Sequence, residues 1–281
     1  MIGFKSKTSR SSKRRKRKQR LKRKYIRYIV FAVVSYIVFL IVTLPASIGF
    51  SFIKNNPQLN RQIQFSSVSG TVWSGSASRV RISGINIGQL DWNLKLLPLL
   101  LGELSVYIKV KNQQASASTV SGAGSIAVSV FGNIKVDNFS ARFPVDLLAP
   151  VLYGLPVRFG GNVNMHINSL SIEKGSRFNL KSRIVVSKAR LVSPQRIEYG
   201  DILILASPQL SGSQFVLTDQ GGPLVLNGIV KLKGNGLYSI NLGLDARNSA
   251  SKDLRAGLGF LGRRDASGKY RYQSKGKLTN W

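Results

Sequence analysis

Apolar and polar residues alternate with a period of two over most of the chain after residue 54, and this pattern constrains the fold more than any other feature. Residues 105–112, 162–168 and 224–233 each repeat it, and residues 238–244 continue it after a turn. Alternation of this kind predicts antiparallel strands with one buried face. The positions that best mark this face are Val106, Ile108, Val110, Val163, Met165 and Ile167.

Glycine-rich turns separate these segments, and the chain contains 27 glycines. The dipeptide Asn235-Gly236 between two alternating segments is the strongest hairpin signal. The sequence therefore predicts an all-β fold, a curved antiparallel β-sheet in the form of a half-pipe or open barrel. A similar rhythm in residues 70–84 and 222–234 fits either a duplicated β-meander or the ordinary spacing of hairpins.

Two short segments after residue 54 have a helical pattern, residues 94–101 and residues 144–152. Each is too short to be stable alone. We expect both to lie across an end of the sheet as apolar helical plugs. The alternative for residues 94–101 is an exposed apolar patch that faces a partner or a lipid chain.

Residues 28–53 form an uncharged stretch of 26 residues, and a helix needs about 20 to cross a bilayer. The stretch predicts one transmembrane helix, with a cleaved signal peptide as the alternative. Residues 1–28 hold 14 lysines and arginines, and such flanks stay in the cytoplasm. The expected organisation is a basic disordered cytoplasmic tail (1–27), the helix (28–53) and a β-rich domain on the far side (54–281).

The chain has a formal net charge of +31, and the basic tail supplies under half of it. Such a tail can contact anionic lipid headgroups or nucleic acid. The sequence favours lipid headgroups, because no aromatic residues alternate with the tail cations, as they do in many single-strand binders.

No motif for catalysis is present. The single histidine, His166, lies on the polar side of a strand, where we expect a solvated or locally hydrogen-bonded ring. The 11 acidic residues are scattered, and the neighbours Glu198 and Asp201 are expected to form ion pairs with nearby arginines. Cysteine is absent. We therefore predict no enzyme activity, no catalytic residue, no metal site and no cofactor.

Three stretches, residues 69–77, 90–104 and 221–278, together resemble the type II secretion system protein N family over roughly residues 29–281. The basic tail lies outside this resemblance. The positions that carry it are Gly70, Trp73, Gly75, Trp92, Pro98, Gly102, Gly228, Tyr270 and Gly276. The resemblance implies a single-pass protein of the cell inner membrane with a periplasmic C-terminal domain. It also implies other secretion components as partners, either the inner-membrane platform or the secretin.

The resemblance leads to two functional hypotheses. The first is a non-catalytic component of type II secretion whose periplasmic domain docks other components. The second follows from the family's more distant resemblance to AsmA-like proteins, and it is a lipid-binding or lipid-transfer protein. Its apolar groove would be lined by the six residues of the alternating face, which a closed fold would bury as core. Trp73 is expected to anchor the core, with ligand contact as its alternative.

Overall fold

The computed structural model describes residues 28–37, 39–40, 42–56, 62–99, 101–111, 120–149, 157–173, 177–261, 264–266 and 268–278. The chain divides into two units, with the boundary between Pro45 and Ala46. The basic tail predicted over residues 1–27 lies outside the described residues.

In the first unit, residues 28–37 are helical and their side chains are exposed. Residues 43–45 are not α-helical, and the next helix, α2 (Ala46–Asn55), belongs to the second unit. The predicted helix over residues 28–53 is thus interrupted near Pro45, which lacks the N–H that would continue a helix. Within the described part of the chain, no helix combines the length and apolarity required for a membrane crossing.

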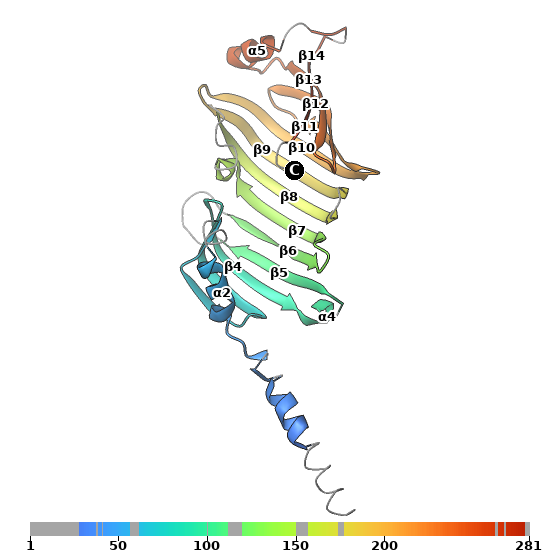
Figure 1. Ribbon diagram of the computed structural model, residues 1–281. Helices are drawn as coiled ribbons and strands as arrows, with labels where there is room; N and C mark the ends of the chain where they lie inside the picture. Colours follow the sequence, from blue (N-terminus) through green and yellow to red (C-terminus); the bar gives the residue numbers. More distant parts are fainter. Residues whose placement is uncertain are drawn as a thin grey trace, which may run out of the picture. The chain divides into compact units, whose positions relative to one another are not determined.

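The second unit is one 14-stranded antiparallel sheet, as the alternation predicts (Figure 1). The strands are β1 (Ile63–Gln64), β2 (Ser67–Gly70), β3 (Ser74–Ile82), β4 (Ile85–Lys95), β5 (Glu103–Lys111), β6 (Ser121–Ser129), β7 (Ile134–Pro144), β8 (Arg158–Glu173), β9 (Arg177–Ser193), β10 (Ile197–Gln209), β11 (Gly212–Asp219), β12 (Leu224–Lys233), β13 (Leu237–Ala246) and β14 (Tyr270–Lys277). From β3 to β14 each strand pairs with the next in sequence, and β1 and β2 both pair with β3. The sheet is open, with β1 at one end of the strand order and β14 at the other.

Local chemistry explains several of these elements. The Asn235-Gly236 turn joins β12 to β13 as predicted, with Gly236 at φ 80° and its N–H donating to the carbonyl of Lys233 at 3.0 Å. β-bulges or register shifts interrupt the β3–β4, β6–β7, β8–β9 and β9–β10 ladders, close to non-glycine residues with positive φ or to glycines. Bulges bend a strand and increase its twist. Residues 70–84 and 222–234 fall on β3 and β12, two strands of the same continuous meander.

The helices differ from those predicted. Leu94 and Lys95 extend β4, and α4 (Leu96–Leu99) is the helical part of the first predicted segment among its described residues. Leu97 is 79% exposed, so α4 is not a plug, and the patch alternative describes it better. The second predicted segment contains the short 3₁₀ helix η1 (Val145–Leu148), whose described residues are also not fully buried.

A further helix, α5 (Lys252–Gly259), was not predicted, because Gly257 and Gly259 weaken its helical pattern. Signals for it exist. Ser251 caps its N-terminus by accepting a hydrogen bond from the N–H of Leu254 at 3.2 Å, and Leu254 and Leu258 are spaced for one face.

The core consists of two clusters, each beneath a helix. One packs Ala46 of α2 against Ala77, Val80 and Trp92. The other packs Leu254 and Leu258 of α5 against strands β10 and β12. Both clusters rest on apolar residues of the alternating sheet face.

Candidate functional site

The apolar face of the sheet is the largest candidate site. Cross-strand pairing places the six predicted residues on this one face: Val110 lies opposite Leu90 and Gly122, and Met165 lies opposite Ala141 and Ile184. Of the six, Val163 is buried at 6% exposure and the other five are half-buried.

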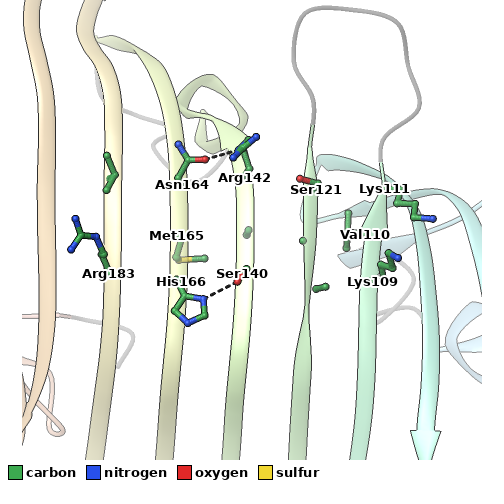
Figure 2. Close-up of a pocket in the computed structure, with 14 residues that line it drawn as sticks. Lys109, Val110, Lys111, Ser121, Ser140, Arg142, Asn164, Met165, His166 and Arg183 are labelled. Carbon is green, nitrogen blue, oxygen red and sulfur yellow. Dashed lines mark hydrogen bonds between the residues drawn. The ribbon is translucent and has the colours of Figure 1, made fainter.

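The structure divides these six residues among different surroundings. Val106 and Ile108 pack at the margin of the Trp92 cluster. Val163 lines an apolar cavity. Val110 and Met165 also line a hollow that crosses β5 to β9, and most of its other lining residues belong to the opposite, polar face (Figure 2). Ile167 lies opposite Phe139 and Ser182 on the same face.

The apolar cavity has a volume of about 650 Å³ and lies between strands β8 to β13 and the helices η1 and α5. Its walls are mainly aliphatic. Val163 and Phe159 come from β8, Leu226 comes from β12, and Leu254 and Leu258 come from α5. Ligand pockets of this size and character are typical of sites for apolar small molecules.

Two polar side chains, Tyr199 and Arg190, also line this cavity. Burial raises the pKa of the Tyr199 hydroxyl. The phenol is therefore neutral at physiological pH, and it adds a polar group without adding a charge to an otherwise apolar wall.

A hydrogen-bond network around Asp219 holds the segment that leads into α5. The Asp219 carboxylate accepts bonds from the N–H groups of Gly221 at 3.2 Å and Leu226 at 3.1 Å, and from the Arg247 guanidinium. Arg247 also donates to the carbonyl of Gly222 at 2.7 Å, and Arg255 of α5 donates to the carbonyl of Arg247 at 2.9 Å. The network thus links the β11–β12 turn to the helix that covers the cavity.

This network also sets the charge state of Asp219. Burial acts to raise the pKa of the carboxyl, but the hydrogen bonds from Arg247, Leu226 and Gly221 and the charge of Arg247 together lower it below its usual value. Asp219 is therefore ionised at physiological pH and remains a strong acceptor.

Several family-motif glycines accommodate a large side chain on the neighbouring strand. A Cβ atom at Gly75 would lie 2.6 Å from the Trp92 ring, and one at Gly276 would lie 2.6 Å from the Tyr238 hydroxyl. Each pair is directly opposite in register. At Gly228 a Cβ would lie 2.7 Å from the carbonyl oxygen of Asn241. These glycines are needed for close packing between strands.

The remaining motif residues are structural as well. Gly70 has φ 92° before the β2–β3 turn, and Gly102 has φ 73° after α4, which contains Pro98. Tyr270 begins β14 and packs against the α5 cluster. The structure brings three motif positions together, since Gly70, Gly75 and Trp92 line a hollow of about 340 Å³. Pro98, Gly102 and Tyr270 do not line it and lie at other turns and packing contacts.

Trp92, and not Trp73, is the buried tryptophan of the N-terminal cluster. Trp92 is 9% exposed and its Nε1–H donates to the carbonyl of Val72 at 3.1 Å. Trp73 is half-buried, and its carbonyl accepts a bond from the N–H of Leu94 at 2.6 Å. The glycine opposite Trp92, Gly75, is the signal that distinguishes the two rings.

The polar residues considered for chemistry have structural partners. His166 is exposed and shares a hydrogen bond of 2.8 Å with the Ser140 hydroxyl, as expected for a locally bonded ring. Glu198 pairs with Arg196 at 3.5 Å. Asp201 instead accepts the backbone N–H of Lys188 at 2.8 Å. Among the described residues, no group of three or more acidic, histidine or cysteine side chains could hold a metal ion.

A second surface is the apolar tip, which we define as Leu96, Leu97, Leu101, Val130 and Phe131. The N–H of Val130 donates to the carbonyl of Gly102 at 2.9 Å, so the α4–β5 and β6–β7 connections lie side by side. Leu101 is 87% exposed and Phe131 is 75% exposed. Exposed apolar patches of this kind mark interaction sites.

An open antiparallel sheet with an apolar face, a helix-covered cavity and an exposed apolar tip places the chain in the class of all-β proteins. The family model described as "Type II secretion system (T2SS), protein N" matches residues 61–273. The chain therefore belongs to this family, as the sequence motifs indicate. The family consists of secretion-system components and is not one of known enzymes.

Two curated relatives carry the name "Type II secretion system protein N". The protein from Vibrio cholerae serotype O1 is 23% identical over 245 residues, and the alignment covers 85% of this chain and 93% of the relative. The protein from Aeromonas hydrophila is 25% identical over 248 residues with the same coverage. No solved structure matches the chain significantly.

Proposed function

We propose that this protein is a non-catalytic inner-membrane component of type II secretion whose β domain, on the periplasmic side, docks other components of the machine. The family match is the observation that carries the proposal, because residues 61–273 include nearly the whole sheet. The uncharged segment that begins at Tyr28, after the basic tail, would anchor the chain with its N-terminus in the cytoplasm.

The apolar tip is the surface best suited to docking. Its side chains are largely exposed, so they contribute little to folding, yet they form a cluster at adjacent connections. A partner that covered Leu97, Leu101 and Phe131 would remove apolar area from water, which is the main favourable term in protein association.

The test combines secretion with a matched pair of variants. In a strain from which the gene for this protein has been deleted, we expect the wild-type gene to restore export of type II substrates. The double variant Leu101→Ser/Phe131→Ser should restore it at least tenfold less well. The control Leu210→Ser/Phe260→Ser removes a leucine and a phenylalanine that are even more exposed, at 103% and 92%, and should behave as wild type.

Two results would contradict the proposal. Normal secretion in the strain that lacks the chain would exclude a role in export. Full activity of Leu101→Ser/Phe131→Ser, at a protein level equal to wild type, would exclude the apolar tip as the docking surface.

The apolar cavity favours a second candidate function, the binding or transfer of a lipid. Gly257 of α5 lines the cavity, and nothing lies within 4 Å of a Cβ placed there. Gly257→Leu should fill part of the cavity and reduce the phospholipid that mass spectrometry detects in the purified full chain. Gly259→Leu is the matched control, because Gly259 is also unobstructed but does not line the cavity. Equal lipid content in both variants and the wild type would exclude this function for the cavity.

A further inference from the structure

The polar face of strands β5 to β9 contains a basic hollow, which we define as Lys109, Lys111, Arg142, His166 and Arg183. The hollow has a volume of about 720 Å³ and is open to solvent on one side. Figure 2 shows its side chains on neighbouring strands, with the labelled cations on both sides of the small residue Ser121. Val110, Met165 and Val185 also line it, and no aspartate or glutamate is found among the described residues of its lining.

Strand register brings these residues together. Lys109, Ala123, Ser140, His166 and Arg183 form one row across the strands, each opposite the next. A second, adjacent row contains Lys111, Ser121, Arg142, Asn164 and Val185. The small side chains of Ser121, Ala123 and Ser140 lie in the middle of these rows, which makes the surface concave.

The four lysines and arginines of the basic hollow carry more positive charge than the described acidic residues around them can balance. Within the part of the chain that the structure describes, Lys109, Lys111, Arg142 and Arg183 form no ion pair. The nearest acid in register, Asp91, lies opposite Lys109 and accepts a bond from Gln89 at 2.8 Å. Uncompensated like charges on one concave surface raise the local potential and attract anions.

Two hydrogen bonds orient the donors of the hollow. Arg142 donates its Nε–H to the Asn164 side-chain oxygen at 2.6 Å, and this leaves the two terminal nitrogens of the guanidinium for a ligand. His166 uses Nδ1 in its bond to Ser140, so its Nε2 is available. A preoriented guanidinium suits the two oxygens of a carboxylate.

We propose that the basic hollow binds an extended acidic segment of another protein. Strands are spaced about 4.8 Å apart, so the four intervals from β5 to β9 span about 19 Å. An extended peptide of about six residues covers this length, at about 3.3 Å per residue. Acidic side chains at every second position would all point toward the hollow and reach successive cations.

The dimensions favour this occupant over other anions. A single phosphate is too small to contact all four lysines and arginines, which lie on β5, β7 and β9. A bilayer surface is broad, and it would meet the rim of a concave site before its floor. The proposal depends only on the β domain, so it stands or fails separately from docking at the apolar tip.

The test uses the full chain in detergent and a fluorescein-labelled peptide of eight residues, (Glu-Ser)₄, that carries a photo-cross-linker. We expect cross-links in residues 103–111 and 134–193, and the peptide (Gln-Ser)₄ should give none. The variant K109Q/K111Q/R142Q/R183Q should bind at least tenfold more weakly at low salt, because each exposed charge contact contributes a modest amount and four are lost together.

A control removes the same number of charges elsewhere on the polar surface. The variant K231Q/K233Q/K275Q/K277Q changes four exposed lysines of β12 and β14, and it should bind the peptide within twofold of wild type. Circular dichroism should show that both variants retain the sheet.

Three outcomes would overturn the proposal. Cross-links confined to the basic tail would place the binding there. Equal loss in both quadruple variants would indicate a general effect of net charge. If vesicles that contain phosphatidylglycerol, and not the peptide, depend on the four cations of the hollow, the occupant is a lipid surface and not a protein segment.

Discussion

The two helix-covered regions of the sheet cover their apolar side chains in different ways. At the N-terminal end, α2 packs an aromatic ring against two rings of the β-sheet region: the Phe50 ring centroid lies 5.1 Å from that of Trp92 and 4.9 Å from that of Phe65. At the C-terminal end, α5 covers the sheet with leucines and leaves a cavity of about 650 Å³.

The difference indicates separate roles for the two ends. A region that is filled by interlocking rings gains stability from every contact, and a change of one ring is costly. A region with a large apolar cavity lacks part of the side-chain contacts that would otherwise stabilise it. We infer that the α2 region is a structural base and that the α5 region is the part of the domain suited to accept a ligand.

The largest effect is expected at the α2 end. Trp92→Ala should lower the free energy of unfolding by about 3–5 kcal/mol, because it removes a buried ring and leaves a cavity. Leu254→Ala at the α5 end should cost about 2 kcal/mol, near the low end for such changes, because its surroundings are already incompletely packed. Urea unfolding followed by far-UV circular dichroism measures the free energy of unfolding of both variants. Equal losses in the two variants would contradict the difference in packing between the α2 and α5 ends.

A smaller effect is expected when α5 loses its attachment. Asp219→Asn removes the charge that accepts bonds from Arg247, Leu226 and Gly221, and it should cost about 1–3 kcal/mol. Hydrogen exchange of residues 252–259 should accelerate, while that of α2 should not. The control Glu198→Gln breaks an exposed ion pair and should change stability by less than about 1 kcal/mol. Unchanged exchange in α5 would show that the Asp219 network does not hold the helix.

The same carboxylate predicts a pH dependence that is confined to the α5 end. Because the pKa of Asp219 is lower in the folded protein, its contribution is complete above the unfolded pKa of about 3.9. The contribution is lost as the pH falls below that value through the folded pKa. Hydrogen exchange of α5 should therefore accelerate in acid in the wild type and change less in Asp219→Asn. The same acid response in both proteins would assign the effect to other groups.

The smallest effect is a stabilisation. Gly257→Ala should raise the free energy of unfolding by about 0.5–1 kcal/mol, because alanine favours the helix and its methyl group enters open space. Gly259→Ala, at the last residue of α5, should have a smaller effect because helix ends fray. Thermal unfolding distinguishes the two variants. A destabilised Gly257→Ala would show that the space beside this residue is not free.

Much of the sheet was predictable because its signals are local. Alternation along a strand decides which side chains share a face, and Asn235-Gly236 specifies its hairpin within a few residues. The resemblance to the family was also visible in the sequence, and the family match confirms it. The short helices were predicted less well. Residues 94–101 have helical periodicity, but pairing with β5 draws Leu94 and Lys95 into β4.

The candidate sites depend on contacts that a single strand does not reveal. The sequence identified the apolar face but not the cavity, since the cavity requires α5 to lie across strands that come much earlier in the chain. It predicted only a solvated or locally hydrogen-bonded ring for His166, and the histidine gains its interest from Arg142 and Arg183 on the neighbouring strands. A search for motifs along the sequence does not detect such a group, because its residues lie on different strands and meet only through strand pairing.

By itself the sequence determined an antiparallel β domain with one apolar face, its main turns and its family, because periodicity and turn chemistry act over short distances. The tertiary structure decided which residues meet across strands. Register accumulates over 14 strands and shifts at each bulge, so the grouping of cations in the basic hollow follows from the assembled ladder. The hydrogen-bond network that leads into α5 likewise joins Asp219 to Arg247 across the β12–β13 hairpin. Only the folded chain brings these two residues together.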